Sequence, residues 1–236
     1  MKPERDATFE RILDRQMRLW ESEQVRHPPQ EAPVRPNLAI SQPACSGGRE
    51  LAERLAARLG WELYDRNIVE ALHEHDTLGK SVLESLDQHL LAWREDWIYH
   101  LFVPGHTSTT AYVQRLSRLV FSIAMRGNAV FVGRGAGCII PQENRLDVLV
   151  TSSFKARQER WLAERGGTPE QARRELVRLD RERGEFISRS FHREIDQPLS
   201  HDLCVNLETL GLDACEALVL GALGARFPQL QRAPIG

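Results

Sequence analysis

The chain has 236 residues, of which 42% are hydrophobic and 27% are charged, and this composition fits one sizeable globular domain or a domain with a small appendage. Its 31 lysines and arginines nearly balance 33 aspartates and glutamates, so the net charge of −2 does not favour a nucleic-acid-binding protein. No apolar run approaches the roughly 20 residues that cross a bilayer, and the four scattered cysteines argue against a disulfide framework or a zinc site. We therefore expect a cytoplasmic protein that binds neither nucleic acid nor membrane.

Residues 1–37 are expected to form an N-terminal arm. Apolar side chains recur at helical spacing within residues 1–25, and the prolines from Pro28 to Pro36 then make a linker that cannot continue a helix. An amphipathic helix of this kind packs on its own domain, binds a partner protein, or joins two copies of the chain. The sequence leaves these alternatives open.

A main domain is expected over residues 38–228, where strands alternate with helices. The run from Ala129 to Val132 is apolar throughout, which is typical of a parallel strand buried on both faces. Gly60 is expected to end a helix, and Thr168 with Gln171 forms a capping-box pattern that starts one. In chain order we predict a strand at 38–40, a helix at 49–59, a strand at 61–64, helices at 68–75, 83–97 and 116–124, strands at 129–132 and 147–150, helices at 154–165 and from 168, a strand at 203–205 and a helix at 213–223. This alternation predicts an α/β fold with a parallel sheet covered by helices.

The first candidate site is the loop that follows the first strand. Small residues there let backbone N–H groups curl around an anion, and the next helix adds the positive end of its dipole. The spacing of strand, loop and helix is that of a P-loop, although the strict G-x-x-x-x-G-K-[ST] pattern is not met. The candidate phosphate-binding residues are Ser46, Gly47, Gly48, Arg49 and Glu50.

Two of these residues differ in type from the strict pattern. Gly48 stands where the pattern has lysine, and Arg49 next to it could supply the missing charge, because a guanidinium binds phosphate bidentately. Glu50 lies next to the position at which serine or threonine would hold Mg²⁺, so it could ligate the metal, or it could be an acidic residue favoured in a first helical turn. The alternative is a glycine-rich turn that binds no ligand.

A second candidate is Arg134, which follows a buried strand and lies between two glycines. Ligands of open α/β sheets bind beyond the carboxyl ends of the strands, so this position would expose the guanidinium at the ligand edge. The alternative is an arginine that reaches into solvent from the end of a strand.

Three stretches of the chain read AISQPACSGGRELAERLAARLGWELYDRNIVEAL, AVFVGRGAGCII, and DVLVTSSFKARQERWLAERG through to DLCVNLETLGLDACEALV, and they cover residues 38–225. Together they resemble the cytidylate kinase-like family of P-loop nucleoside monophosphate kinases. The resemblance implies a P-loop core, a monophosphate-binding region and an arginine-rich helical LID over about residues 168–200. It also implies transfer of the ATP γ-phosphoryl group, with Mg²⁺, to a nucleoside monophosphate, CMP or dCMP.

The resemblance also implies roles for single residues. Arg134 matches the arginine that faces the monophosphate, and Asp65 matches a position that would hold the acceptor nucleotide or a metal-bound water. Asp65 could instead be the N-cap of a following helix. The LID arginines that best match residues closing over both phosphates are Arg178, Arg181 and Arg183. Each of them could equally belong to a solvated helix whose acidic residues pair with it.

The loop departs from the family pattern at three positions. Cys45 stands where the family usually has glycine, and its Cβ is expected to hinder a positive φ and a close phosphate approach. Ala44 replaces an aromatic or similar residue, and Pro43 removes a backbone donor. Three functions therefore stay open: a nucleoside monophosphate kinase, a non-catalytic nucleotide-binding regulatory module with the N-terminal arm as its output, and a kinase of another small acceptor.

Overall fold

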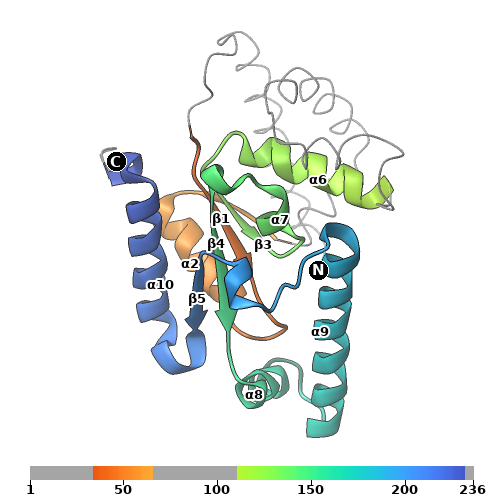
Figure 1. Ribbon diagram of the computed structural model, residues 1–236. Helices are drawn as coiled ribbons and strands as arrows, with labels where there is room; N and C mark the ends of the chain where they lie inside the picture. Colours follow the sequence, from red (N-terminus) through yellow and green to blue (C-terminus); the bar gives the residue numbers. More distant parts are fainter. Residues whose placement is uncertain (1–33, 66–110, 232–236) are drawn as a thin grey trace, which may run out of the picture. The chain divides into compact units, whose positions relative to one another are not determined.

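The computed structural model describes residues 34–65 and 111–231, which are the coloured parts of Figure 1. The N-terminal arm and the helices expected at 68–75 and 83–97 lie outside these residues. The chain divides into two compact units, Met1–Val34 with Arg66–Ser122 and Arg35–Asp65 with Ile123–Gly236. Helix α6 (Ala111–Ala124) supplies nearly all of the described part of the first unit, and it starts earlier than the predicted 116–124.

Five parallel strands form the sheet of the second unit, in the order β2-β3-β1-β4-β5. The strands are β1 (Asn37–Ser41), β2 (Glu62–Tyr64), β3 (Ala129–Val132), β4 (Arg145–Thr151) and β5 (Leu203–Asn206). Because β1 is central and the chain turns outward on both of its sides, its carboxyl end is a topological switch point, where ligands of such sheets bind. The predicted α/β class with a parallel, helix-covered sheet is confirmed.

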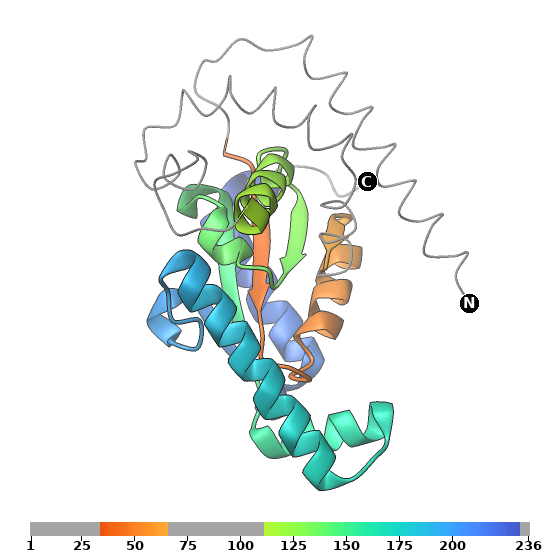
Figure 2. The same ribbon diagram turned by 90° about the vertical axis from the view of Figure 1, so that its right-hand side faces the viewer.

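Helices cover the sheet of this unit and extend beyond its edge. They are α2 (Gly48–Leu59), the short α7 (Ala136–Ile139), α8 (Phe154–Arg165), α9 (Pro169–Phe191) and α10 (Leu207–Arg226). Apolar side chains of α2 and α10, such as Leu55 and Val219, pack with Ile40 and Val148 of the central strands into one buried core. Helix α8 follows the end of β4, and the C-terminal half of α9 lies across the sheet from α2 (Figure 2).

Local signals explain most of the helix ends. The hydroxyl of Thr168 accepts the N–H of Gln171 at 3.3 Å and the Gln171 side chain accepts the N–H of Thr168 at 2.9 Å, so the predicted capping box is present. Gly60 ends α2 in the left-handed region at φ 65°. No helix among the described residues is long and apolar enough to span a membrane.

Two predicted elements start earlier than expected, and four short elements were not predicted. Helix α10 starts at Leu207 and not at 213, because the side chain of Asn206 accepts the N–H groups of Glu208 and Thr209 and so caps a first turn, which is kinked at Gly211 (φ 76°). Strand β4 starts at Arg145 rather than 147. The short η segments at Gln142–Asn144, Pro198–Ser200 and Pro228–Gln231 and the short helix α7 were not predicted, because one turn of helix carries no periodicity.

Candidate functional site

The loop between β1 and α2 lies at the carboxyl end of the central strand. Gly47 forms the N-cap of α2 in the left-handed region, at φ 86°. A Cβ on Gly47 would lie 2.5 Å from Nη1 of Arg160, and one on Gly48 would lie 2.7 Å from Oε1 of Gln42. The left-handed conformation favours glycine at position 47, and a side chain at either position would displace Arg160 or Gln42 from the loop.

Cys45 adopts φ 59°, the left-handed conformation that its Cβ was expected to hinder. The turn is held around it by the N–H of Ser46, which donates to the Pro43 carbonyl at 3.3 Å, and by Arg160, which donates to the Cys45 carbonyl at 3.1 Å. Burial, with the charge of Glu164, raises the pKa of the Cys45 thiol. The thiol is therefore not activated as a nucleophile at neutral pH.

Protein oxygens already occupy some of the loop's hydrogen-bond donors. Oε1 of Gln42 accepts the Ser46 hydroxyl at 3.1 Å and the N–H of Arg49 at 3.2 Å. The N–H of Ala44 donates to the Oδ1 carboxylate oxygen of Asp180 at 3.0 Å. In the described part of the chain, no acceptor bonds to the N–H groups of Gly47 and Gly48. These two donors lie at the N-terminus of α2, where an anion is stabilised by both the donors and the helix dipole.

Two arginines of α8 reach the same loop. The side chain of Arg157 is 9% exposed, and its Nη1 donates to the Ala44 carbonyl at 3.2 Å and to Oδ2 of Asp180 at 2.7 Å. The Nε of Arg157 is buried and has no hydrogen-bond partner among the described residues. Arg160 lies three residues on, on the same face of α8, and donates to the Cys45 carbonyl. The family resemblance also implies that these two arginines, three residues apart on one helix, reach the phosphate-binding region, and the structure brings both guanidinium groups to the loop.

Arg49 and Asp65, both predicted site residues, are brought together by the structure. Nη2 of Arg49 lies 2.9 Å from Oδ2 of Asp65, and Nε of Arg49 lies 2.9 Å from Oε1 of Glu53. The hydrogen bond to Glu53 and the charge of Asp65 raise the pKa of Arg49. Asp65 is buried at the end of β2, whereas Glu50 is exposed in the first turn of α2.

Arg134 lies in a left-handed turn after β3. Its φ of 55° falls between those of Gly133 (74°) and Gly135 (71°). The guanidinium carbon lies 5.8 Å from the ring centroid of Phe186 on α9, a cation–π distance. A Cβ on Gly135 would lie 2.9 Å from Cζ of Phe191. The turn that carries Arg134 therefore packs against the C-terminal part of α9.

The three predicted LID arginines divide between two environments on α9. Arg183 is partly buried and bonds to Asp196, while its Nε and Nη1 are buried without a hydrogen-bond partner among the described residues. Arg178 bonds to two glutamates on its own helix at 2.8 and 2.7 Å, and Arg181 is 73% exposed and lies 3.5 Å from Glu185. Of these three arginines, only Arg183 has buried guanidinium nitrogens without a hydrogen-bond partner among the described residues, and a bound anion could accept from them.

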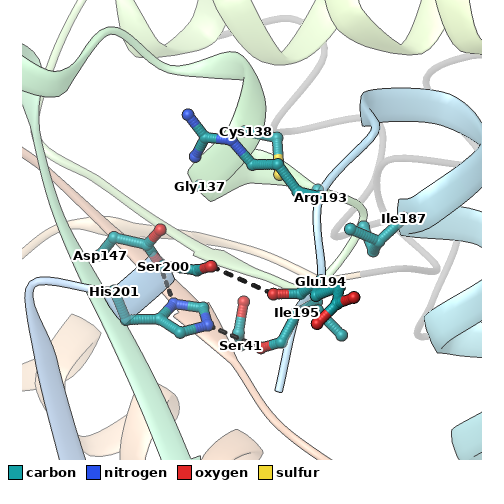
Figure 3. Close-up of a pocket in the computed structure, with 11 residues that line it drawn as sticks. Ser41, Gly137, Cys138, Asp147, Ile187, Arg193, Glu194, Ile195, Ser200 and His201 are labelled. Atoms are coloured by element: carbon teal, nitrogen blue, oxygen red, sulfur yellow. Dashed lines mark hydrogen bonds and ion pairs between the residues drawn. The ribbon is translucent and has the colours of Figure 1, made fainter. Parts of the chain in front are cut away.

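A small cavity lies beside the end of β1, and Figure 3 shows the residues that line it. Nδ1 of His201 lies 3.1 Å from Oδ1 of Asp147 in β4, and its Nε2 lies 2.8 Å from the Ile195 carbonyl. Because both ring nitrogens face acceptors, the doubly protonated ring satisfies both contacts. Burial raises the pKa of the Cys138 thiol in this cavity to about 11, so that thiol is inert. The pair of His201 and Asp147 was not predicted from the sequence, because the two residues lie 54 positions apart in the chain.

The predicted Mg²⁺ has one candidate ligand at the loop, the carboxylate of Glu50. Among the residues that the structure describes, no group of three or more His, Cys, Asp or Glu could hold a metal ion. Mg²⁺ in phosphoryl-transfer sites needs only one or two carboxylates, because phosphate oxygens and waters complete its shell. The exposed carboxylate of Glu50 at the loop fits that requirement, and its role stays a prediction.

The fold is shared with solved structures at low sequence identity. An uncharacterized protein from Eubacterium ventriosum is 16% identical with a TM-score of 0.66, covering 81% of this chain and 99% of that one. A gluconokinase from Sinorhizobium meliloti is 14% identical with a TM-score of 0.48, covering 84% and 97%, and a shikimate kinase from Bacteroides thetaiotaomicron is 14% identical with a TM-score of 0.44, covering 80% and 97%. Only the first of these three has a TM-score above 0.5, so the likeness of fold rests on that structure.

The family is shown by a different comparison. A search of curated proteins found no match. A family model described as the cytidylate kinase-like family matches residues 37–209, from the first residue of β1 to the first turn of α10. This range covers well over half of the 236 residues and contains every described strand of the sheet. The chain therefore belongs to the cytidylate kinase-like family.

Proposed function

We propose that this protein is a kinase that transfers the γ-phosphoryl group of ATP to a nucleoside monophosphate, with CMP or dCMP as the expected acceptor. Membership of the cytidylate kinase-like family supports the reaction class. The observation that carries the proposal is the loop after β1, where the N–H groups of Gly47 and Gly48 have no acceptor in the described part of the chain and the buried guanidinium of Arg157 lies alongside. Backbone donors, a helix N-terminus and arginine are the groups that hold phosphate in proteins.

The residues of the site would act by positioning and by neutralising charge. Phosphoryl transfer needs little covalent chemistry from the protein, so no side chain has to act as a nucleophile. The loop residues 46–50 would bind the ATP phosphates, and Mg²⁺, when bound, would supply further neutralisation of their charge. Arg134 and Asp65 would bind the acceptor on the other side of the transferred group. The LID, residues 168–200 of a domain spanning 38–228, would exclude the water that otherwise accepts the phosphoryl group.

The test is ADP production from ATP and Mg²⁺ with a panel of ribo- and deoxyribonucleoside monophosphates. We expect ADP to form only when an acceptor is present, with a cytidine nucleotide preferred. The variant Arg134→Ala serves as the site control and Gly184→Ala as a matched control, since a Cβ on Gly184 of α9 meets nothing within 4 Å. Wild-type turnover no faster than that of Arg134→Ala, with every acceptor in the panel, would contradict the proposal.

A second candidate is a nucleotide-binding regulatory module that does not transfer phosphate. The observation in its favour is the double ion pair of Arg49 with Asp65 and Glu53, which engages the arginine that the sequence offers in place of the P-loop lysine. Nucleotide binding without acceptor-dependent turnover would support this module over the kinase. In that case residues 1–37 would carry its output to a partner protein or a second copy of the chain.

A further inference from the structure

A carboxylate from α9 binds a backbone N–H of the loop between β1 and α2 and a guanidinium group beside that loop. Oδ1 of Asp180 accepts the N–H of Ala44 at 3.0 Å, and Oδ2 of the same carboxylate accepts Nη1 of Arg157 at 2.7 Å. The same nitrogen of Arg157 donates to the Ala44 carbonyl at 3.2 Å. A loop residue and α9, 136 residues apart in sequence, are thus tied together through a single anionic group.

The partners of this carboxylate are those of a bound phosphate. An anion whose oxygens accept a backbone N–H of a loop and a guanidinium N–H is held as such loops hold phosphoryl groups. Asp180 is only partly accessible, with 25% of its side chain exposed, and Arg157 is 9% exposed. Of the carboxylates in the described part of the chain, only that of Asp180 forms an ion pair with Arg157. Without it the guanidinium would be a buried charge lacking a counter-ion.

We propose that Asp180 is a resident competitor for phosphate: it holds the loop and Arg157 when no nucleotide is bound, and a phosphate displaces it. The proposal rests on the proposed function, because it concerns the same loop. Two anions cannot share one guanidinium and one N–H without repulsion, so the arrival of phosphate and the departure of the carboxylate are coupled. Release of Asp180 breaks the link between the loop and α9, so the position of α9 becomes sensitive to whether the loop holds phosphate.

The competitor is tested by removing its charge while keeping its shape. Binding of inorganic pyrophosphate, and separately of ATP without acceptor, is measured by titration calorimetry for the wild type and for Asp180→Asn. The amide keeps an oxygen that can accept the Ala44 N–H, but it no longer competes as an anion. Because a hydrogen bond to a charged group is the stronger kind, we expect the variant to bind pyrophosphate about tenfold more tightly.

Three further variants separate the charge effect from other changes. Glu170→Gln removes the same charge from an exposed position in the first turn of α9 and should leave the affinity within about twofold. Asp180→Glu keeps the charge and should bind no more tightly than the wild type. Asp180→Ser repeats the neutralisation with a smaller side chain, in case the asparagine variant does not fold.

The outcomes distinguish this proposal from the proposed function. If Asp180→Asn and Asp180→Ser bind pyrophosphate more tightly than the wild type, and Asp180→Glu and Glu170→Gln do not, the proposal that Asp180 competes with phosphate is supported. Pyrophosphate binding that is unchanged or weaker in Asp180→Asn and Asp180→Ser, while the wild type still binds, overturns the competitor and leaves the loop as a phosphate site. Failure of the wild type and of the neutral variants to bind pyrophosphate or ATP overturns both the competitor and the proposed function.

Discussion

Replacing Gly137 with alanine should destabilise the fold through one buried carboxylate. Gly137 lies in α7 and has no positive φ, so its backbone accepts alanine. The added Cβ, however, would lie 2.6 Å from Cγ and 2.7 Å from Oδ1 of Asp147. Asp147 lies in the middle of β4, is 3% exposed and pairs with His201, so a shift of its carboxylate away from the new methyl group disturbs that pair.

The loss of stability follows from the pair of Asp147 with His201, which the new methyl group disrupts. If the Asp147 carboxylate turns away from the new methyl group, it leaves His201, and breaking a buried ion pair costs about 3–5 kcal/mol. Partial movement of α7 would relieve some of the clash, so we expect a loss of about 3 kcal/mol in the free energy of unfolding. For a domain of this size that corresponds to a fall in Tm of roughly 6–12 °C.

The measurement is urea unfolding followed by circular dichroism, with thermal unfolding as a second probe. The matched control is Gly184→Ala in α9, where the new Cβ meets nothing within 4 Å. An alanine in a helix interior is more stable than a glycine there, so this variant should gain about 0.5–1 kcal/mol. A Gly137→Ala protein as stable as the wild type would refute the argument that Asp147 is held in place by its neighbours.

Three further predictions concern single side chains. Burial alone would lower the pKa of His201, but the hydrogen bond and the charge of Asp147 outweigh burial and raise that pKa. The stability that the protonated His201 ring contributes is therefore fully present below the unfolded pKa of about 6.5, and it is lost as the pH rises through the higher folded pKa. The unfolding free energy of the wild type should therefore lose its advantage over His201→Gln as pH rises, and a difference that stays constant with pH would count against the charged ring. Arg134→Ala should remove most turnover with Tm unchanged, and full turnover would remove Arg134 from the site. Arg49→Ala should weaken ATP binding several-fold in calorimetry, whereas unchanged affinity would limit Arg49 to its contact with Asp65.

The sequence was sufficient for features that depend on neighbouring residues. The apolar run Ala129–Val132 indicated a buried parallel strand, and Thr168 with Gln171 indicated the start of α9. The small residues after β1 indicated a tight turn that leads into α2, and anion binding by that turn stays a prediction. These signals are short-range, because periodicity, caps and turn residues act within a few positions of the chain. The family resemblance, which rests on the order of three such stretches, was confirmed by the family match.

The partner of each charged residue was decided only by the tertiary structure. An arginine-rich segment with interleaved acids is compatible with many pairings, and the sequence ranked Arg178, Arg181 and Arg183 together. Packing of α9 left Arg178 bonded to glutamates of its own helix and placed the carboxylate of Asp180 on the loop. Asp180 and its loop partner are 136 residues apart, and no local pattern records a contact of that range. Strand order and helix packing bring such residues together, which is why the sequence predicted the loop but not the carboxylate that contacts it.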